Sequence, residues 1–185
     1  KISGAYTTVA TNDPDWGILQ AQTTVGVSYA KGDKTKVSGG YTTTATVDSE
    51  WGTVEATQTV GVSYAKGDKT KISGAYTTIA TNDPDWGILQ AQTTVGVSYA
   101  KGDKTKVSGG YTTTATVDSE WGTVEATQTV GVSYAKGDKT KISGAYTTVA
   151  TNDPDWGILQ AQTTVGVSYA KGDKTKISGG YTTTA

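Results

Sequence analysis

The sequence predicts an all-β protein, an antiparallel up-and-down meander of tandem β-hairpins, and three observations lead to that prediction. The chain repeats itself every 35 residues. Its composition is rich in Thr and Gly, which favours strands and turns over helices. Polar and apolar residues alternate, whereas the apolar spacing of an amphipathic helix is absent. We expect an open stacked sheet or a sandwich, with a closed β-barrel as the alternative.

The repeat defines the domain organisation. Residues 1–70 return as 71–140 with one change, Val9 to Ile79, and the segment begins again at Lys141. Because each 70-residue unit is two similar halves, we treat residues 1–185 as a single repeat array. Its repeats are 1–35, 36–70, 71–105, 106–140, 141–175 and the partial repeat 176–185. Since the sequence has no initiator Met, we expect it to be an excerpt of a longer or processed chain.

Each repeat is expected to contain two strands. From Leu19 to Tyr29 the odd-numbered residues are mostly apolar and the even-numbered ones mostly polar. From Ile2 to Ala10 the even-numbered residues are expected on the same apolar face. The strands should then have about 12–14 residues, or about 40–46 Å at strand rise. This pattern predicts about 11 strands.

Two turn signals separate the strands. Residues 13–17 (DPDWG) place Pro and Gly where a tight turn accepts them, and residues 48–52 (DSEWG) keep the Asp, Trp and Gly. The other turn, residues 31–34 (KGDK), uses Gly to supply a positive φ. The turn glycines of the first two repeats are Gly17, Gly32, Gly52 and Gly67.

Loop parity predicts which residues share a face, because a one-residue slip moves every side chain to the other side. We expect an even number of residues, four, in the Pro14 turn and an odd number in the Gly32 turn. These parities put one set of residues on a common face: Ile2, Tyr29, Val37 and Tyr41. Ser28 and Ser38 belong on the opposite face. Mid-strand polar residues of the less polar face should form hydrogen-bonded ladders: Thr8, Thr23, Thr43 and Gln58.

Composition excludes several functional classes. The chain has no His and no Cys, and its net charge is −1, so it lacks the basic footprint of a nucleic-acid-binding protein. No apolar run is long enough for a transmembrane helix. We expect the acidic turn residues to close turns, so we predict no enzyme, no cofactor and no metal centre. Asn12, Asp13 and Asp15 lack the ligand number of an EF-hand loop, and only weak calcium binding stays open there.

Charge placement suggests how copies associate. The Gly32-type turns carry a net positive charge and the Pro14-type turns a net negative charge, so the sheet should have one basic and one acidic margin. We expect these margins to meet between neighbouring copies. The candidate basic residues are Lys31, Lys34, Lys36, Lys66 and Lys69, and the candidate acidic residues are Asp13, Asp15, Asp48 and Glu50.

Aromatic residues recur at fixed places and are expected to form ladders. In a meander, one Trp per hairpin gives a row spaced about 9.6 Å apart, which is two strand widths. Such a row packs over its own turns, lies at a contact between chains or stacks against the sugars of a polysaccharide; the last is the least favoured. The candidate ladder residues are Trp16, Trp51, Trp86, Trp121, Trp156, Tyr29 and Tyr64.

Two partial resemblances accompany these patterns. Residues 25–33 (VGVSYAKGD) and 72–78 (ISGAYTT) resemble paired strands of Gram-negative porins, which implies a transmembrane barrel. The polar residues expected at mid-strand and the short turns depart from that family. Across its whole length the chain also resembles functional-amyloid and archaeal-sheath proteins, through composition and repetition and not through a motif.

The sequence therefore predicts a structural protein that self-assembles through stacked β-hairpin repeats into an extracellular sheath, wall or amyloid-like fibre. The expected partner is the protein itself. A porin-like pore, natural or designed, in the outer membrane is the alternative, and a membrane is a partner only in that case.

Overall fold

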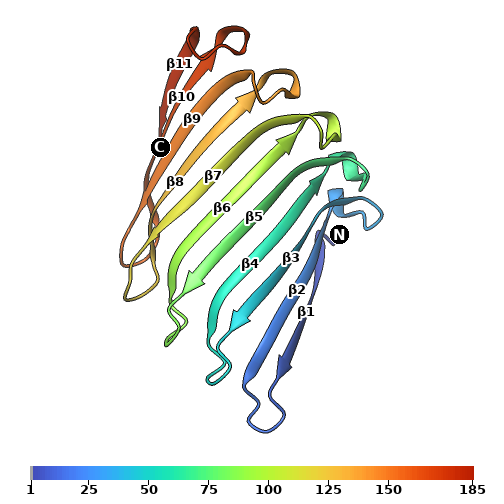
Figure 1. Ribbon diagram of the computed structural model, residues 1–185, viewed down its shortest axis with the longest axis vertical. Coiled ribbons are helices and arrows are strands. Elements are labelled where there is room, and N and C mark those ends of the chain that lie inside the picture. The colour runs from blue at the N-terminus through green and yellow to red at the C-terminus, as the bar shows by residue number, and fades with distance from the viewer. Residues whose placement is uncertain (1) are drawn as a thin grey trace.

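Eleven antiparallel strands form one sheet in chain order, and each strand pairs only with its neighbours in the sequence (Figure 1). The computed structural model describes residues 2–185. The strands are β1 (Gly4–Asn12), β2 (Leu19–Tyr29), β3 (Val37–Val47), β4 (Val54–Tyr64), β5 (Ile72–Asn82), β6 (Leu89–Tyr99), β7 (Val107–Val117), β8 (Val124–Tyr134), β9 (Ile142–Asn152), β10 (Leu159–Tyr169) and β11 (Ile177–Thr184). This confirms the predicted open meander: β1 and β11 each have one neighbour, so the sheet is not closed.

The strands are shorter than predicted. Nine of them have 11 residues, β1 has nine and β11 has eight. The turns are correspondingly longer than predicted: six residues separate β1 from β2, and seven separate β2 from β3. The parities are therefore even and odd as predicted, although the Pro14 turn has six residues and not four.

The predicted sharing of faces is wrong, and β-bulges are the physical reason. The register shifts by one residue beside every turn, for example between Thr11 and Asn12 and between Ser28 and Tyr29. A bulge puts two residues opposite one, which reverses the parity argument. Tyr41 pairs with Gly26, so it shares a face with Ser28, whereas Tyr29 alternates onto the other face. Tyr29 still pairs directly with Val37.

The same reversal divides the predicted polar ladder. Thr8 and Thr43 lie on one face, in register with Thr24. Thr23 and Gln58 lie on the other, where both pair with Thr44. The four residues were expected together, and the structure separates them into two pairs.

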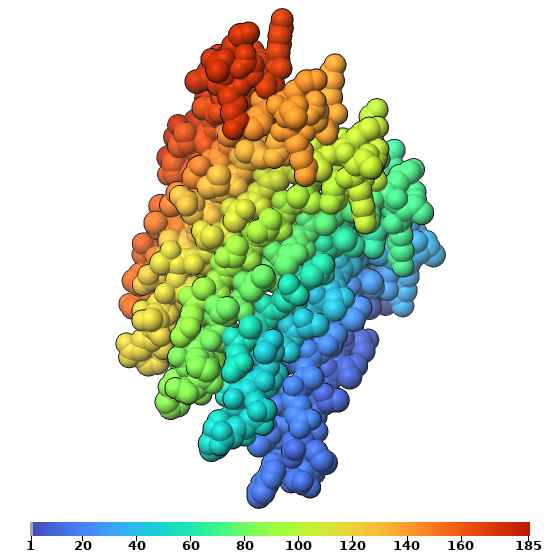
Figure 2. Space-filling model, viewed as in Figure 1, coloured from blue at the N-terminus to red at the C-terminus, as the bar shows by residue number. Residues whose placement is uncertain are grey.

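The sheet has almost no core. Within residues 2–185 the only buried apolar residues are Val37, Ala80 and Val107, each 8% exposed, and no large side chain is fully buried. The strands form a single layer that no other element covers (Figures 1 and 2). Backbone pairing and side-chain contacts along each face therefore hold the sheet together.

Candidate functional site: two faces and two margins

One face of the sheet carries a row in which tyrosine and glycine alternate from strand to strand. Tyr6 pairs with Gly26, Gly26 with Tyr41, and Tyr41 with Gly61, and the pattern continues to Tyr181. From Tyr41 onward, each ring lies directly over the glycine of the preceding strand, where an added Cβ would collide with it. The covered glycines are Gly26, Gly61, Gly96, Gly131 and Gly166. Each ring fills the space that the missing glycine side chain leaves.

A threonine ladder runs beside this row. It contains one residue per strand, in direct register across the whole sheet: Thr8, Thr24, Thr43, Thr59, Thr78, Thr94, Thr113, Thr129, Thr148, Thr164 and Thr183. The hydroxyls of Thr8 and Thr24 are hydrogen-bonded at 2.8 Å, and the four later hairpins repeat that bond at 2.8–2.9 Å. We call the face with the tyrosine row and this ladder the ladder face.

The threonine hydroxyl bonds and the tyrosine–glycine contacts alternate from one pair of strands to the next. Threonine hydroxyls join the two strands of one hairpin, as in β3 and β4 through Thr43 and Thr59. Tyrosine rings join one hairpin to the previous one, as Tyr41 of β3 does over Gly26 of β2. Cross-strand pairs of this kind each contribute about 0.2–1 kcal/mol. Side-chain contacts on the ladder face therefore link each strand to the next, and every repeat provides the same contacts.

The opposite face, which we call the valine face, is mainly apolar, and no other described element covers it. It carries the Val25 and Val27 pair of β2 and its equivalents, interspersed with Thr42, Thr44 and Gln58. It also holds every exposed valine or isoleucine of the strand interiors among the described residues: Val9, Val25, Val60, Ile79, Val95, Val130, Val149 and Val165. Their exposed fractions run from 40 to 62%.

The register has no stagger from hairpin to hairpin. Following the pairs from Thr8 through Thr24 leads to Thr43, which is the same position one 35-residue repeat later. The next two steps lead from Thr43 through Thr59 to Thr78 in the same way. Equivalent residues therefore lie on lines at right angles to the strands. Figure 1 shows the turns at each end of the sheet following one another in chain order.

The acidic margin is built from Asx turns. Asp13 Oδ1 accepts hydrogen bonds from the backbone N–H groups of Asp15 and Trp16, at 2.9 and 2.8 Å. Gly17 has a φ of 70° and donates its N–H to the Asp13 carbonyl. Asp48 closes the second type of turn in the same manner, with Glu50 and Trp51 as donors. These aspartates close turns, which is the role that the sequence predicted for them.

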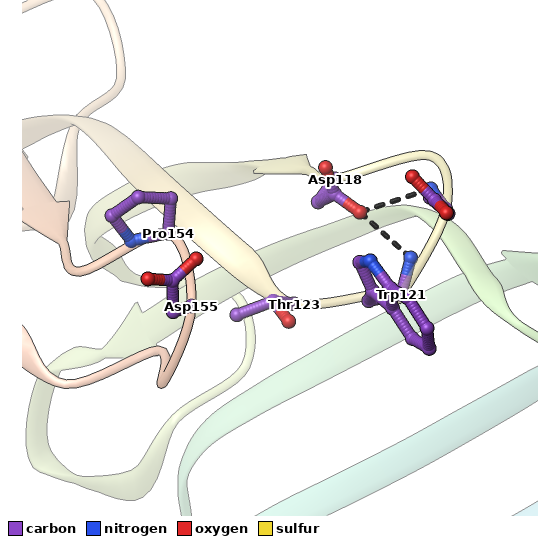
Figure 3. A pocket seen from close by; sticks show the side chains of 6 residues that line it. Asp118, Trp121, Thr123, Pro154 and Asp155 are labelled. Atoms are coloured by element: carbon purple, nitrogen blue, oxygen red, sulfur yellow. Dashed lines mark hydrogen bonds between the residues drawn. The ribbon is translucent and has the colours of Figure 1, made fainter.

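The tryptophans of this margin project into solvent. Their exposed fractions run from 76 to 83%, so they do not pack over their own turns. Figure 3 shows Trp121 beside Asp118, with Pro154 and Asp155 reaching in from the adjacent turn. Together with Glu120 and Thr123 these residues line a shallow, polar hollow. Nowhere in residues 2–185 do three His, Cys, Asp or Glu side chains gather closely enough to hold a metal ion.

The basic margin is built from a tight turn with two left-handed residues. The short 3₁₀ segments lie at Ala30–Gly32, Ala65–Gly67, Ala100–Gly102, Ala135–Gly137 and Ala170–Gly172. In the first of them Lys31 has a φ of 53° and Gly32 a φ of 70°, and Asp33 donates its N–H to the Ala30 carbonyl. Two positive φ angles in succession are the signature of a type I′ turn. The sequence predicted the glycine of this turn but not the left-handed conformation of Lys31.

Asp33 organises the rest of this loop. Its Oδ1 accepts hydrogen bonds from the Thr35 hydroxyl at 2.7 Å and from the Thr35 N–H at 2.9 Å, and Lys36 Nζ lies 3.6 Å from Oδ2. The Thr35 hydroxyl, the Thr35 N–H and the Lys36 charge hold the pKa of Asp33 below its usual range. The four later turns repeat both the contacts and the direction of the shift.

The structure sorts the predicted margin residues into two groups. Lys36 pairs with Asp33, and Asp13 and Asp48 close their own turns. Lys31 and Lys34, with their equivalents Lys66 and Lys69, and the carboxylates of Asp15 and Glu50 form no ion pair among residues 2–185. Any contact between margins would therefore use this second group.

Tyr29 and Tyr64, the predicted ladder tyrosines, lie at the basic ends of β2 and β4, on the valine face. The tyrosines that cover glycine were not among the predicted ladder residues, and Tyr41 was predicted only to share a face with Tyr29. The signal that could have identified them is a Tyr and a Gly at paired positions in every repeat, which is readable only once the bulges set the register.

The fold and these surfaces define a class, a tandem β-hairpin repeat protein with one open antiparallel sheet. Comparison with protein families and with curated proteins finds no match. Among the described residues, no helix is long and apolar enough to cross a membrane.

Proposed function

We propose that the chain is a structural protein that self-assembles through stacked β-hairpin repeats into an extracellular sheath, wall or amyloid-like fibre. The observation that carries the proposal is the unstaggered register of the eleven-strand sheet. Each hairpin is displaced from the last by about two strand widths, or about 9.6 Å, with the same contacts. Such a sheet can be extended in line by further hairpins of the same polypeptide or of another copy.

The edge of the sheet supports this proposal. Among residues 2–185 no glycine lies on the outer side of β1 for Tyr6 to cover, and Tyr6 is 75% exposed, whereas its equivalent Tyr41 is only partly exposed. In this part of the chain the outward backbone groups of β1 have no strand partner, because β2 is its single neighbour among the described strands. A further strand with glycine opposite Tyr6 would satisfy both. Open edges of this kind are the growth surfaces of stacked β-assemblies.

The alternative function is a porin-like pore. Strands of 11 residues are long enough to span a bilayer when tilted, and the valine face would meet lipid. The register argues against it, since closing a barrel requires a stagger that tilts the strands by roughly 35–45°. The polar Thr44 and Gln58 in the middle of the valine face argue against it as well.

Electron microscopy of the purified chain tests the proposal. Filaments, ribbons or tubes in aqueous buffer are expected, whereas isolated rings in detergent that conduct ions across bilayers would favour the pore and contradict the proposal.

A matched pair of edge variants makes that test specific. The Tyr29 N–H donates to Ser3, and alternation then turns the N–H of Ala10 outward from β1. Ala10→Pro removes that outward donor and should stop growth, while Ala10→Val keeps the donor and should leave growth unchanged. Equal growth of both variants would contradict assembly through the β1 edge.

A further inference from the structure

The single-layer sheet exposes far more surface than a folded monomer of its size. Its accessible surface is 11647 Å², whereas a compact protein of 19.1 kDa exposes about 8,400 Å². The excess is about 3,200 Å² for one chain and about 6,400 Å² for two copies, which is more than enough to supply the total of 2,000–5,000 Å² that obligate interfaces bury. Edge-to-edge growth covers only the outer strands, so it leaves this excess in place.

The excess is apolar on one side only. The exposed valines and isoleucines of the strand interiors all lie on the valine face, and no charged residue interrupts that face between Ala21 and Tyr29 or between Ala56 and Tyr64. On the ladder face, by contrast, the tyrosine rings already lie over their glycines. An uncharged surface that exposes so many valines marks an interaction site.

The valine face is also corrugated with a period of 70 residues, which is two repeats. A shallow hollow lies over Gly40, bordered by Val27, Val62 and Tyr64. An equivalent hollow lies over Gly110, 70 residues later, where Val97 and Val132 form the border. Ridges of valine and hollows over glycine therefore recur at the same interval across the sheet. A second copy is the partner that repeats this interval strand for strand.

We infer that the valine face packs against the valine face of a second copy, giving two sheets about 10 Å apart with a dry interface. The mixed chemistry of the face selects this partner over lipid. In hydrocarbon the side chains of Thr42, Thr44 and Gln58 would have no hydrogen-bonding partner. A second copy brings the same hydroxyls and amides to the same depth, as facing sheets of a steric zipper do. This contact does not depend on growth at the sheet edges.

Single-cysteine variants test the inference, because the chain has no other thiol. Val95→Cys places a thiol on the valine face of the central strand β6, at a side chain that is 50% exposed. Ser98→Cys places one three residues away on the ladder face of the same strand, at a position that is also exposed. Both substitutions are small, and neither Val95 nor Ser98 takes part in the hydroxyl bonds of the threonine ladder.

The first readout is the rate at which iodoacetamide labels each thiol in the folded protein in buffer. The Val95→Cys thiol should react about tenfold or more slowly than the Ser98→Cys thiol, because labelling then requires the interface to open. The second readout is molar mass at low concentration, which should be that of a dimer or a multiple of it. Equal labelling rates with a monomeric mass would overturn the inference.

Lipid is the competing occupant, and phosphatidylcholine vesicles distinguish it. If the Val95→Cys thiol reacts freely in buffer and becomes protected only with vesicles, the face binds lipid and the inference is wrong. The outcomes also separate this claim from the proposed function. A protected thiol without filaments supports the paired sheets and contradicts growth at the edge, while filaments with a freely reacting thiol do the reverse.

Discussion

The ladder face and the valine face are built on the same strands, yet one is complete and the other is not. On the ladder face, Tyr111 covers Gly96 and the hydroxyls of Thr113 and Thr129 meet at 2.8 Å. On the valine face, Val95 and Val130 remain about half exposed, at 50 and 49%. The difference teaches that period-two alternation lets one repeat perform two tasks. One face joins hairpins into a sheet, and the other keeps its valines about half exposed.

Glycine substitutions should show the largest difference between the faces. Gly96→Ala puts a methyl group where the Tyr111 ring lies, so the ring must leave its site at a cost of about 1–3 kcal/mol. Gly110→Ala, on the next strand and the other face, meets only ordinary contacts, 3.5 Å from the Gly96 carbonyl oxygen. It should stabilise the strand by about 0.5–1 kcal/mol. Urea unfolding midpoints measure both, and a similar loss from each would remove the distinction between the faces.

Threonine substitutions should show the next largest difference. Thr113→Val removes one hydroxyl of a ladder pair and leaves the hydroxyl of Thr129 without that partner, which should cost about 0.5–1.5 kcal/mol. Thr112→Val changes the adjacent residue on the valine face, where no side-chain hydrogen bond is lost, and the free energy of unfolding should stay level or rise. The reverse order of stabilities in urea would show that the hydroxyl ladder does not hold the hairpins together.

A substitution in a turn changes neither face, so its effect on the free energy of unfolding gives a reference for the face variants. Lys101 has a φ of 56°, a conformation that favours glycine. Lys101→Gly should raise the free energy of unfolding by about 0.5–1 kcal/mol. Lys104→Gly in the same loop, where φ is not positive, should lower it slightly. If neither variant differs from the parent in thermal unfolding, the left-handed lysine carries no strain.

Salt should act on the margins and leave both faces unchanged. We predict that neighbouring ribbons abut with Lys31 and Lys34 against Asp15 and Glu50, each exposed pair contributing about 0–1 kcal/mol. In 1 M salt the Debye length falls to about 3 Å, so wide assemblies should separate into intact narrower ribbons. Micrographs in which assemblies keep their width in 1 M salt, or in which like-charged margins meet, would rule out this contact.

Acid should produce the smallest effect, at the basic turns. The pKa of Asp103 is held down by the Thr105 hydroxyl and N–H, with Lys106 assisting. The ionised form therefore stabilises the folded turn above the unfolded aspartate pKa of about 3.9. That contribution is lost as the pH falls through the lowered folded pKa. Asp103→Asn should weaken the turn above pH 4 and reduce the loss in acid, as urea midpoints between pH 2 and 6 would record; an unaltered acid slope would contradict the assignment.

The parts of the fold that could be predicted depend on local sequence. The 35-residue period is read directly from the repetition of the sequence, and the turns at Pro14 and Gly32, and with them the antiparallel meander, follow from patterns within a few residues. The faces could not be predicted, because the bulges beside Asn12 and Tyr29 depend on how each turn docks onto its strands. The contact of Tyr41 with Gly26 joins residues in different repeats, and loop parity alone placed that tyrosine on the wrong face.

X-ray fibre diffraction from aligned assemblies is the most direct test of growth by unstaggered hairpins. Strands stacked at right angles to the growth axis predict a meridional reflection at about 4.8 Å, and the hairpin repeat predicts another at about 9.6 Å. A staggered, closed barrel would tilt its strands by roughly 35–45° and move these reflections off the meridian. Meridional reflections at both spacings are the result we predict, and off-meridional strand reflections would contradict the account.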